Sequence, residues 1–429
     1  MSGPIQTNVE TLRVRAGELF DAMEWPTPSE EEWRRTDLGR FPFDDYQVDD
    51  ERSASTTILE DWSGRDLFPE SEFAAAARFE AGVCVGASGL DSLGESGAIL
   101  ALSNEDVRDL GDELPGPGAN AFEKMLETTL GRIDNRVEAW HYRGELHGAV
   151  LYVPAGVEIA TPVLLDFSEK GQMALTAPHV FVILESGASV QLIVSLTTSE
   201  SDRLLCNSGI HASVAEGARL ELLVIDDLGS ETTHFAHRRA TVDRDARFTQ
   251  FEAHLGGSLV KSRSEAELAG AGSEAYLNGV FFGDNGAHLD IRSVQTHLAP
   301  HTTSRSLYKG VVAGSARTIY QGLIEIDEEA TQADAYLTNN NLVLDDGARS
   351  DSIPSLKIRT NEVKCSHGST TGRIDQAALF YLMSRGFTRD AAQSTIIEGY
   401  FEDVAKRGGP LAIASVMGAI TRRLAGRAA

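Results

Sequence analysis

The short segment Lys364-Cys365-Ser366-His367-Gly368 places a thiol and an imidazole two positions apart. In an extended chain, residues two apart point to the same face, so the side chains of Cys365 and His367 would lie side by side. A thiolate and an imidazole together suit soft or borderline metals such as iron and zinc. Two ligands do not complete a tetrahedral site, so a second chain or a bound species would have to supply the others. Cys365 and His367 are therefore the candidate metal or cofactor ligands.

Two other interpretations of this pair stay open. Cys365 can be a buried structural cysteine beside a histidine that satisfies a turn, which the residue types alone favour over a metal site. The pair can also be a catalytic dyad in which the imidazole activates the thiolate. A dyad needs an orienting third group and an oxyanion hole, and the sequence has a signature for neither. Metal binding is thus the stronger of the two chemical interpretations.

Other chemistry-bearing motifs are scarce. The eleven histidines are scattered, and only His297 and His301 have a spacing that resembles paired metal ligands, in a loop that contains a proline. Most histidines are therefore predicted to be ordinary surface or strand residues. The sequence has no P-loop and no strand-linked Gly-x-Gly-x-x-Gly, so we expect neither ATP hydrolysis nor a bound nucleotide. No catalytic residue is predicted.

Composition excludes several classes of function. The formal net charge of -26 repels nucleic acid and anionic membranes. No apolar run approaches the ~20 residues of a membrane-spanning helix, and the N-terminus lacks the layout of a secretory signal. Three cysteines, Cys84, Cys206 and Cys365, do not suggest a disulfide framework. We therefore expect a cytoplasmic protein with no nucleic-acid or membrane partner.

The elements that must position Cys365 and His367 belong to a long region of alternating apolar and polar residues. Similar turns separate its short strands: Glu185-Ser186-Gly187-Ala188, Ala215-Glu216-Gly217-Ala218, Asp284-Asn285-Gly286-Ala287 and Asp345-Asp346-Gly347-Ala348. Several copies fall about 28–31 residues apart, the kind of period that indicates a solenoid. Each coil cannot bury its apolar face alone, so stacked coils form the core. The alternative is a β-sandwich, but its hairpins would give short loops and no constant long period.

Helical patterns flank this region. At the N-terminus, residues 9–23 are predicted to be helical, Ser29 is predicted to cap a short helix, and residues 114–120 are predicted to break the chain. Residues 41–60 are acidic and unpatterned, which is typical of a surface linker.

The C-terminal part has three helical patterns, over residues 374–385, 388–406 and 411–424. They are expected to cover the last coil, to dock a partner, or to do both.

These changes of pattern divide the chain into three parts. Residues 1–146 form an N-terminal helical and mixed region, residues 147–372 a β-solenoid core, and residues 373–429 a C-terminal helical domain.

Three segments carry a resemblance to a known family. Residues 364–404, KCSHGSTTGRIDQAALFYLMSRGFTRDAAQSTIIEGYFEDV, closely resemble the C-terminal signature of the SufB/SufD family of iron–sulfur cluster assembly proteins. Residues 301–326, HTTSRSLYKGVVAGSARTIYQGLIEI, resemble the strand region that precedes it, and residues 26–38, PTPSEEEWRRTDL, resemble the entry motif of the SufD branch. SufB-like chains carry a cysteine where Asn339 stands here and glutamates around the shared histidine. These departures also indicate the SufD branch.

The resemblance implies a mainly β fold, a right-handed parallel β-helix with helical regions at both ends. It implies a non-catalytic subunit of the SufBCD scaffold, paired with a SufB-like paralogue through the β-helices. The C-terminal helices would dock the SufC ATPase, and the isolated chain could form a homodimer. Cys365 and His367 would face SufB, where iron enters and a transient, shared iron–sulfur cluster forms.

Two alternatives are kept. One is a purely architectural adaptor that holds SufB and SufC without touching metal. The other is a β-helix enzyme of the polysaccharide-lyase kind, which would need a carbohydrate groove and normally a secretion signal.

Overall fold

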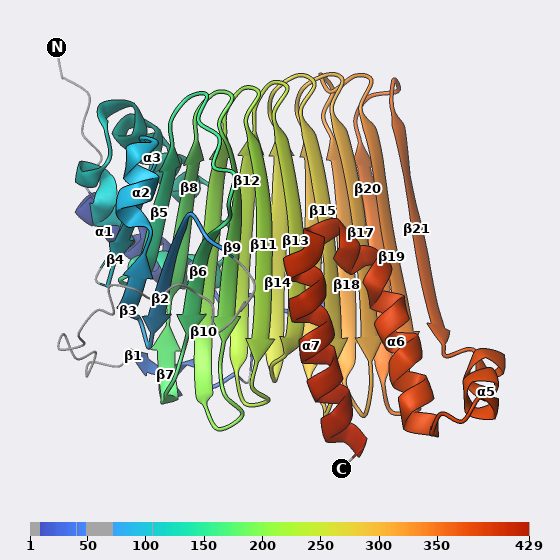
Figure 1. Cartoon of the computed structure of the whole chain (residues 1–429). Helices are drawn as coiled ribbons and strands as arrows, with labels where there is room; N and C mark the ends of the chain where they lie inside the picture. Colours follow the sequence, from blue (N-terminus) through green and yellow to red (C-terminus); the bar gives the residue numbers. More distant parts are fainter. Residues whose placement is uncertain (1–8, 40, 49–71, 105, 429) are drawn as a thin grey trace.

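Parallel strands stacked into a solenoid make up most of the molecule, and helices lie at both ends of the chain (Figure 1). The computed structural model describes residues 9–39, 41–48, 72–104 and 106–428, so residues 49–60 of the expected linker lie outside it. The mainly β prediction is confirmed. The sandwich alternative is wrong, because each long strand pairs in parallel with the strand two further along the chain.

One face of the solenoid is an eleven-stranded sheet in the order β20-β18-β16-β14-β12-β10-β8-β5-β4, with β7 beside β10 and β1 beside β7. Its strands are β1 (Gln47–Val48), β4 (Ile99–Ser103), β5 (His147–Val153), β7 (Gln172–Thr176), β8 (Pro178–Leu184), β10 (Arg203–Val214), β12 (Thr233–Val242), β14 (Leu259–Leu268), β16 (His288–His297), β18 (Arg317–Ile326) and β20 (Arg349–Ile358). Among the described strands of this sheet, only β4 pairs antiparallel, with β5.

The opposite face is a ten-stranded sheet in the order β21-β19-β17-β15-β13-β11-β9-β6-β2-β3. Its strands are β2 (Ala75–Glu80), β3 (Val83–Ser88), β6 (Val163–Ser168), β9 (Ser189–Thr197), β11 (Arg219–Leu228), β13 (Arg247–Gly256), β15 (Glu274–Gly283), β17 (Thr303–Val312), β19 (Asp334–Val343) and β21 (Lys364–Arg373). β20 and β21 are the last strands of the two sheets and form the C-terminal end of the solenoid.

The recurring turns join the two sheets. Gly187, Gly217 and Gly286 have φ values of 72°, 68° and 84°, a left-handed conformation that glycine adopts at little cost. The alanine that follows each turn glycine is buried, and it begins the next run into the core. These three turns therefore share one geometry, which accounts for their repeated spacing.

Side chains inside the solenoid stack in columns because the strands stay in register. One column in the second sheet runs through Leu192, Leu222, Leu277 and Leu337, with Leu337 directly beside His367. These leucines are nearly or fully buried in the main core. The interior column therefore ends at His367 on the last strand.

Most of the N-terminal helices cover the outer face of the eleven-stranded sheet, but α2 (Leu90–Glu95) lies against β2 and β4 and places Leu93 in the solenoid core. The covering elements are α1 (Val9–Ala22), α3 (Gly116–Gly131) and α4 (Arg136–Arg143), with the 3₁₀ turns η1 (Phe43–Asp45) and η2 (Val107–Glu113). A second core joins them to sheet residues such as Phe181 and Phe235. The predicted helix over 9–23 is confirmed, but the capped helix at Ser29 is wrong, because the chain there only forms turns. The predicted break at 114–120 is also wrong, because α3 begins at Gly116 and tolerates Pro117 in its first turn.

The C-terminal helices are α5 (Gln376–Ser384), α6 (Arg389–Ala405) and α7 (Gly409–Ala428), with η3 (Lys406–Gly408) between the last two. A third core packs α6 and α7 on the outer face of the ten-stranded sheet, while α5 lies beyond the last strand (Figure 1). Among the described residues, no helix has the length and apolar character to cross a bilayer.

Candidate functional site

Cys365 and His367 lie on β21, the terminal strand of the ten-stranded sheet. They pair with Ala335 and Leu337, which are 2% and 0% exposed in the interior core. Cys365 itself packs against that core, so both side chains belong to the inward-facing columns. The structure thus places the predicted ligand pair on one face, as its spacing predicts, at the end of the solenoid interior.

The last coil leaves this interior open. On β20, Leu356 and Ile358 pair with the buried Ile324 and Ile326 of β18 and continue their columns. They are nevertheless 38% and 41% exposed. His367 is exposed and Cys365 half-buried. The end of the solenoid therefore presents a mixed surface, with apolar side chains on β20 and a thiol and an imidazole on β21.

Partial burial raises the pKa of the Cys365 thiol. The neutral thiol is a poor metal ligand, since the thiolate is the form that binds. A cation held beside it would favour the thiolate, as would a partner's basic groups. The chain alone therefore supplies an incomplete and unactivated site.

Asn339 occupies the position at which the family resemblance places a cysteine in SufB-like chains. It is fully buried, and its amide Nδ2 donates to the carbonyl of Tyr308 at 3.3 Å and to Oδ1 of Asn341 at 3.2 Å. An amide already committed to neighbouring oxygen atoms is not a ligand for a soft metal. The other two cysteines, Cys84 and Cys206, are buried elsewhere.

An ionic network crosses the solenoid interior. Arg238 on β12 lies 2.8 Å from Asp226 on β11 and 3.0 Å from Glu252 on β13, and His254 lies 2.9 Å from Asp226. Tyr308 donates to Glu252 at 2.5 Å. Close cations lower the carboxyl pKa values despite burial, that of Glu252 to about 2. The network links the two sheets from the inside.

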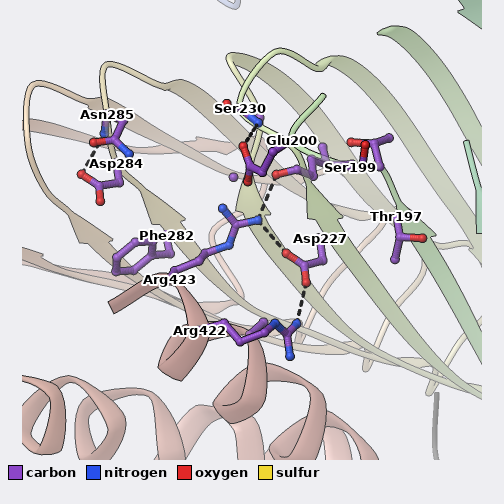
Figure 2. Close-up of a pocket in the computed structure, with 15 residues that line it drawn as sticks. Thr197, Ser199, Glu200, Asp227, Ser230, Phe282, Asp284, Asn285, Arg422 and Arg423 are labelled. Atoms are coloured by element: carbon purple, nitrogen blue, oxygen red, sulfur yellow. Dashed lines mark hydrogen bonds and ion pairs between the residues drawn. The ribbon is translucent and has the colours of Figure 1, made fainter. Parts of the chain in front are cut away.

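A cavity of about 530 Å³ lies between the end of α7 and the solenoid edge. Figure 2 shows Arg422 and Arg423 directed at Asp227, and their guanidinium groups lie 2.8 and 2.6 Å from its carboxylate. Arg423 also donates to the carbonyls of Leu228 and Leu255. Because both guanidinium groups are held by Asp227 and Arg423 also by backbone carbonyls, the cavity marks the point where α7 is anchored to the sheet.

The histidines differ from the sequence-based expectation. His297 and His301 are not a ligand pair, because both ring nitrogens of His297 bond Thr302 and Ser304, and His301 is exposed in a turn. Three others, His141, His179 and His237, are buried together under α4. Sequence reasoning missed this cluster, although His179 and His237 lie one solenoid period before and after Gly209.

The comparisons with known proteins agree with this architecture. Residues 167–400 match the family model described as SUF system FeS cluster assembly, SufBD core domain. The match covers more than half of the chain. The chain belongs to the SufBD family.

SufBD relatives with curated names include an iron–sulfur cluster assembly SufBD family protein of Mycobacterium bovis, 31% identical over 278 residues, which span 63% of this chain and 69% of the relative. A Mycobacterium leprae protein of the same description is 31% identical over 287 residues, or 64% and 71% of the two chains. The iron–sulfur cluster assembly protein SufD of Escherichia coli is 30% identical over 223 residues, or 52% and 53%. The likeness to SufD agrees with the SufD-branch features of the sequence.

Proposed function

We propose that this SufBD-family chain is a SufD-type, non-catalytic subunit of a SufBCD scaffold in the cytoplasm. Its Cys365 and His367 would hold iron or a nascent iron–sulfur cluster together with a SufB-like paralogue. One observation carries the proposal: a thiol and an imidazole stand on the terminal strand of a solenoid whose interior is open at that end. The ATPase activity would belong to SufC.

The open end supports a paralogous partner. Terminal strands with free backbone groups invite pairing with another chain, so proteins normally cover them. A SufB-like solenoid would present matching terminal strands, extend both sheets and bury Leu356 and Ile358. An isolated chain would be able to pair with a second copy in the same way.

The same end supports a shared ligand set. This chain offers one thiol and one imidazole there, and Asn339 is committed to other bonds. Clusters are held mainly by thiolates, typically four of them. The remaining ligands would come from the partner, so a cluster formed there is transient and shared.

Replacing the ligand pair tests this role. We expect Cys365→Ser with His367→Ala to leave the fold and the assembly intact, since His367 is exposed and Cys365 is only partly buried, but to lower the cluster yield severalfold. The measurement is iron content and visible absorbance of the complex purified anaerobically with SufB and SufC. The matched control is His301→Ala, which removes an exposed histidine from a turn. Normal cluster yield in the double variant would instead favour the architectural adaptor.

The C-terminal helices support the docking of SufC. α5 and the turn after it expose Phe380 (73%), Tyr381 (56%), Phe387 (44%) and Met383 (40%). Exposed aromatic side chains of this density are typical of an interface rather than of a free surface. Because α6 and α7 are packed against the sheet, a partner on α5 would be coupled mechanically to the solenoid.

We expect Phe380→Ser with Tyr381→Ser to weaken SufC binding at least tenfold while SufB binding persists, because truncated aromatic anchors often cost more than about 2 kcal/mol. The measurement is complex mass after co-purification, where the unmodified chain should give a 1:1:2 assembly of SufB, this chain and SufC. The matched control is Val14→Ser, which removes an apolar side chain, 52% exposed, from α1. Unchanged SufC content in the double variant would place the docking surface elsewhere.

A further inference from the structure

Three histidines meet at the junction between α4 and the outer face of the eleven-stranded sheet. His141 comes from α4, His179 from β8 and His237 from β12, and they are 2%, 0% and 6% exposed. One nitrogen from each lies within 4.8 Å of the others. The strand β21, which carries Cys365, is the last strand at the C-terminal end of the solenoid (Figure 1), so this cluster is separate from the site described above.

A glycine makes room for the cluster. Gly209 on β10 stands between His179 and His237 in the register of the sheet. A Cβ at this position would come within 2.3 Å of His179 Nδ1 and 2.7 Å of His237 Nε2. The two rings therefore converge over the space that a side chain at Gly209 would fill.

The hydrogen bonds orient the rings as ligands. His141 Nδ1 lies 2.7 Å from the carbonyl oxygen of Asn207 and donates to it, so its Nε2 carries the lone pair. His179 Nδ1 lies 2.8 Å from this Nε2 and donates to it, so a metal bound by both nitrogens would replace that proton. A backbone carbonyl that fixes one ring nitrogen is the usual outer partner of a metal-bound histidine. His179 Nε2 is buried and has no hydrogen-bond partner among the described residues.

The electrostatics keep the imidazoles in the metal-binding form. Burial lowers the pKa of His141 to about 3 and holds those of His179 and His237 well below the usual range of an imidazole. Neutral imidazole is the form that ligates a metal. The nearby Arg239 lies 3.3 Å from Glu265 and 3.6 Å from Glu138, which offset its charge.

We propose that His141, His179 and His237 form a binding site for a divalent transition metal such as Zn²⁺ or Fe²⁺. Three imidazoles suit these borderline cations and leave a fourth position for water. His237 lines a cavity of about 30 Å³, which is room enough for a water molecule and gives a route to the site. A tetrahedral metal with bonds of about 2.0–2.1 Å separates two ligand nitrogens by about 3.3 Å, so the 2.8 Å contact between His141 and His179 would open slightly.

A bound metal would join elements that are distant in the sequence. α4 belongs to the N-terminal region, whereas β8 and β12 belong to successive coils. The metal would therefore tie the N-terminal helices to the solenoid. This role is independent of the proposed function at Cys365 and His367.

Cobalt binding tests the site. The full chain carrying Cys365→Ser and His367→Ala, which removes the other candidate ligands, is stripped of metal and titrated with Co²⁺ under anaerobic conditions. We expect one Co²⁺ per chain with visible d–d absorption, displaced by Zn²⁺, and a higher melting temperature with Zn²⁺. In this background, His179→Gln and His237→Gln should each lose more than the roughly 10–100-fold in affinity that removal of an outer partner costs.

His211→Gln is the matched control. His211 is as buried as the three ligands and bonds Thr129 at 2.7 Å and Tyr142 at 3.1 Å, but it lies outside the cluster. It should keep the Co²⁺ spectrum. If His179→Gln does not fold, the test relies on Co²⁺ binding by His237→Gln, because His237 lies at the rim beside the cavity. Absence of stoichiometric Co²⁺ binding, or full binding in His237→Gln, would overturn the proposal.

Discussion

Lowering the pH from 7 to about 5 should unfold the isolated, metal-free chain cooperatively. Burial lowers the pKa values of seven histidines, that of His141 to about 3 and those of His234 and His297 to about 4, with those of His179, His211, His237 and His288 also lowered. In the unfolded chain each titrates near 6.5. Below that pH the unfolded state binds more protons, so the free energy of unfolding falls by about 1.4 kcal/mol per pH unit for each histidine. A total stability of about 5–15 kcal/mol would be exhausted within one to two units.

The other buried titratable groups do not reverse this fall in the free energy of unfolding between pH 7 and 5. The pKa of His254 is raised by Glu252 and Asp226, so its contribution is fully present below about pH 6.5 and is lost only as the pH rises above that. Burial raises the pKa of Glu138 to about 7, so this carboxyl adds stability as the pH falls from 7 and offsets one histidine. The lowered pKa values of Glu252 and Asp226 give stability above about pH 4 that is lost only at lower pH. The check is the midpoint of urea unfolding, followed by circular dichroism from pH 7 to 5. A flat or rising midpoint would contradict the prediction, and His297→Gln should make the midpoint fall less steeply with pH.

The sequence predicts the solenoid because its signal is local and repeated. A turn such as Glu185-Ser186-Gly187-Ala188 needs a positive φ at one glycine, and the same need recurs at Gly217 and Gly286. The break predicted from Leu114 to Asn120 is wrong because its local signal has a second interpretation. Prolines and glycines there suggest a break, but the first turn of a helix lacks internal N–H partners and accepts Pro117.

The two candidate sites differ in how readily they can be predicted from the sequence. Cys365 and His367 are neighbours in the chain, so strand geometry alone brings them together. The histidine cluster combines one helix with two strands, and its members meet only once the register is known. Its sequence signal is a histidine one coil before and one coil after Gly209. That signal can be recognised only after the strands have been paired.

Replacing Arg238 with methionine should destabilise the protein by about 3–5 kcal/mol. Arg238 is 4% exposed and bonds Asp226 and Glu252 from opposite sides of its guanidinium, and it also donates to Ser262 at 2.8 Å. Methionine fills a similar volume but carries no charge. The buried carboxylates of Asp226 and Glu252 would then have His254 as the remaining nearby cation of the network. Taking charges out of water is costly, and here the cost would no longer be offset. The measurement is urea unfolding at pH 7.5.

Arg244→Met gives the matched control, because Arg244 and Glu216 form an ion pair of 3.1 Å on the turns, with side chains 60% and 53% exposed. Exposed pairs contribute about 0–1 kcal/mol, so this variant should unfold close to the original midpoint. Adding Asp226→Asn and Glu252→Gln to Arg238→Met should restore part of the lost stability, since the uncompensated charges then disappear. If Arg238→Met and Arg244→Met cost the same, the interior network does not hold the two sheets together. If the triple variant is no more stable than Arg238→Met, lost packing and hydrogen bonds outweigh the buried charges.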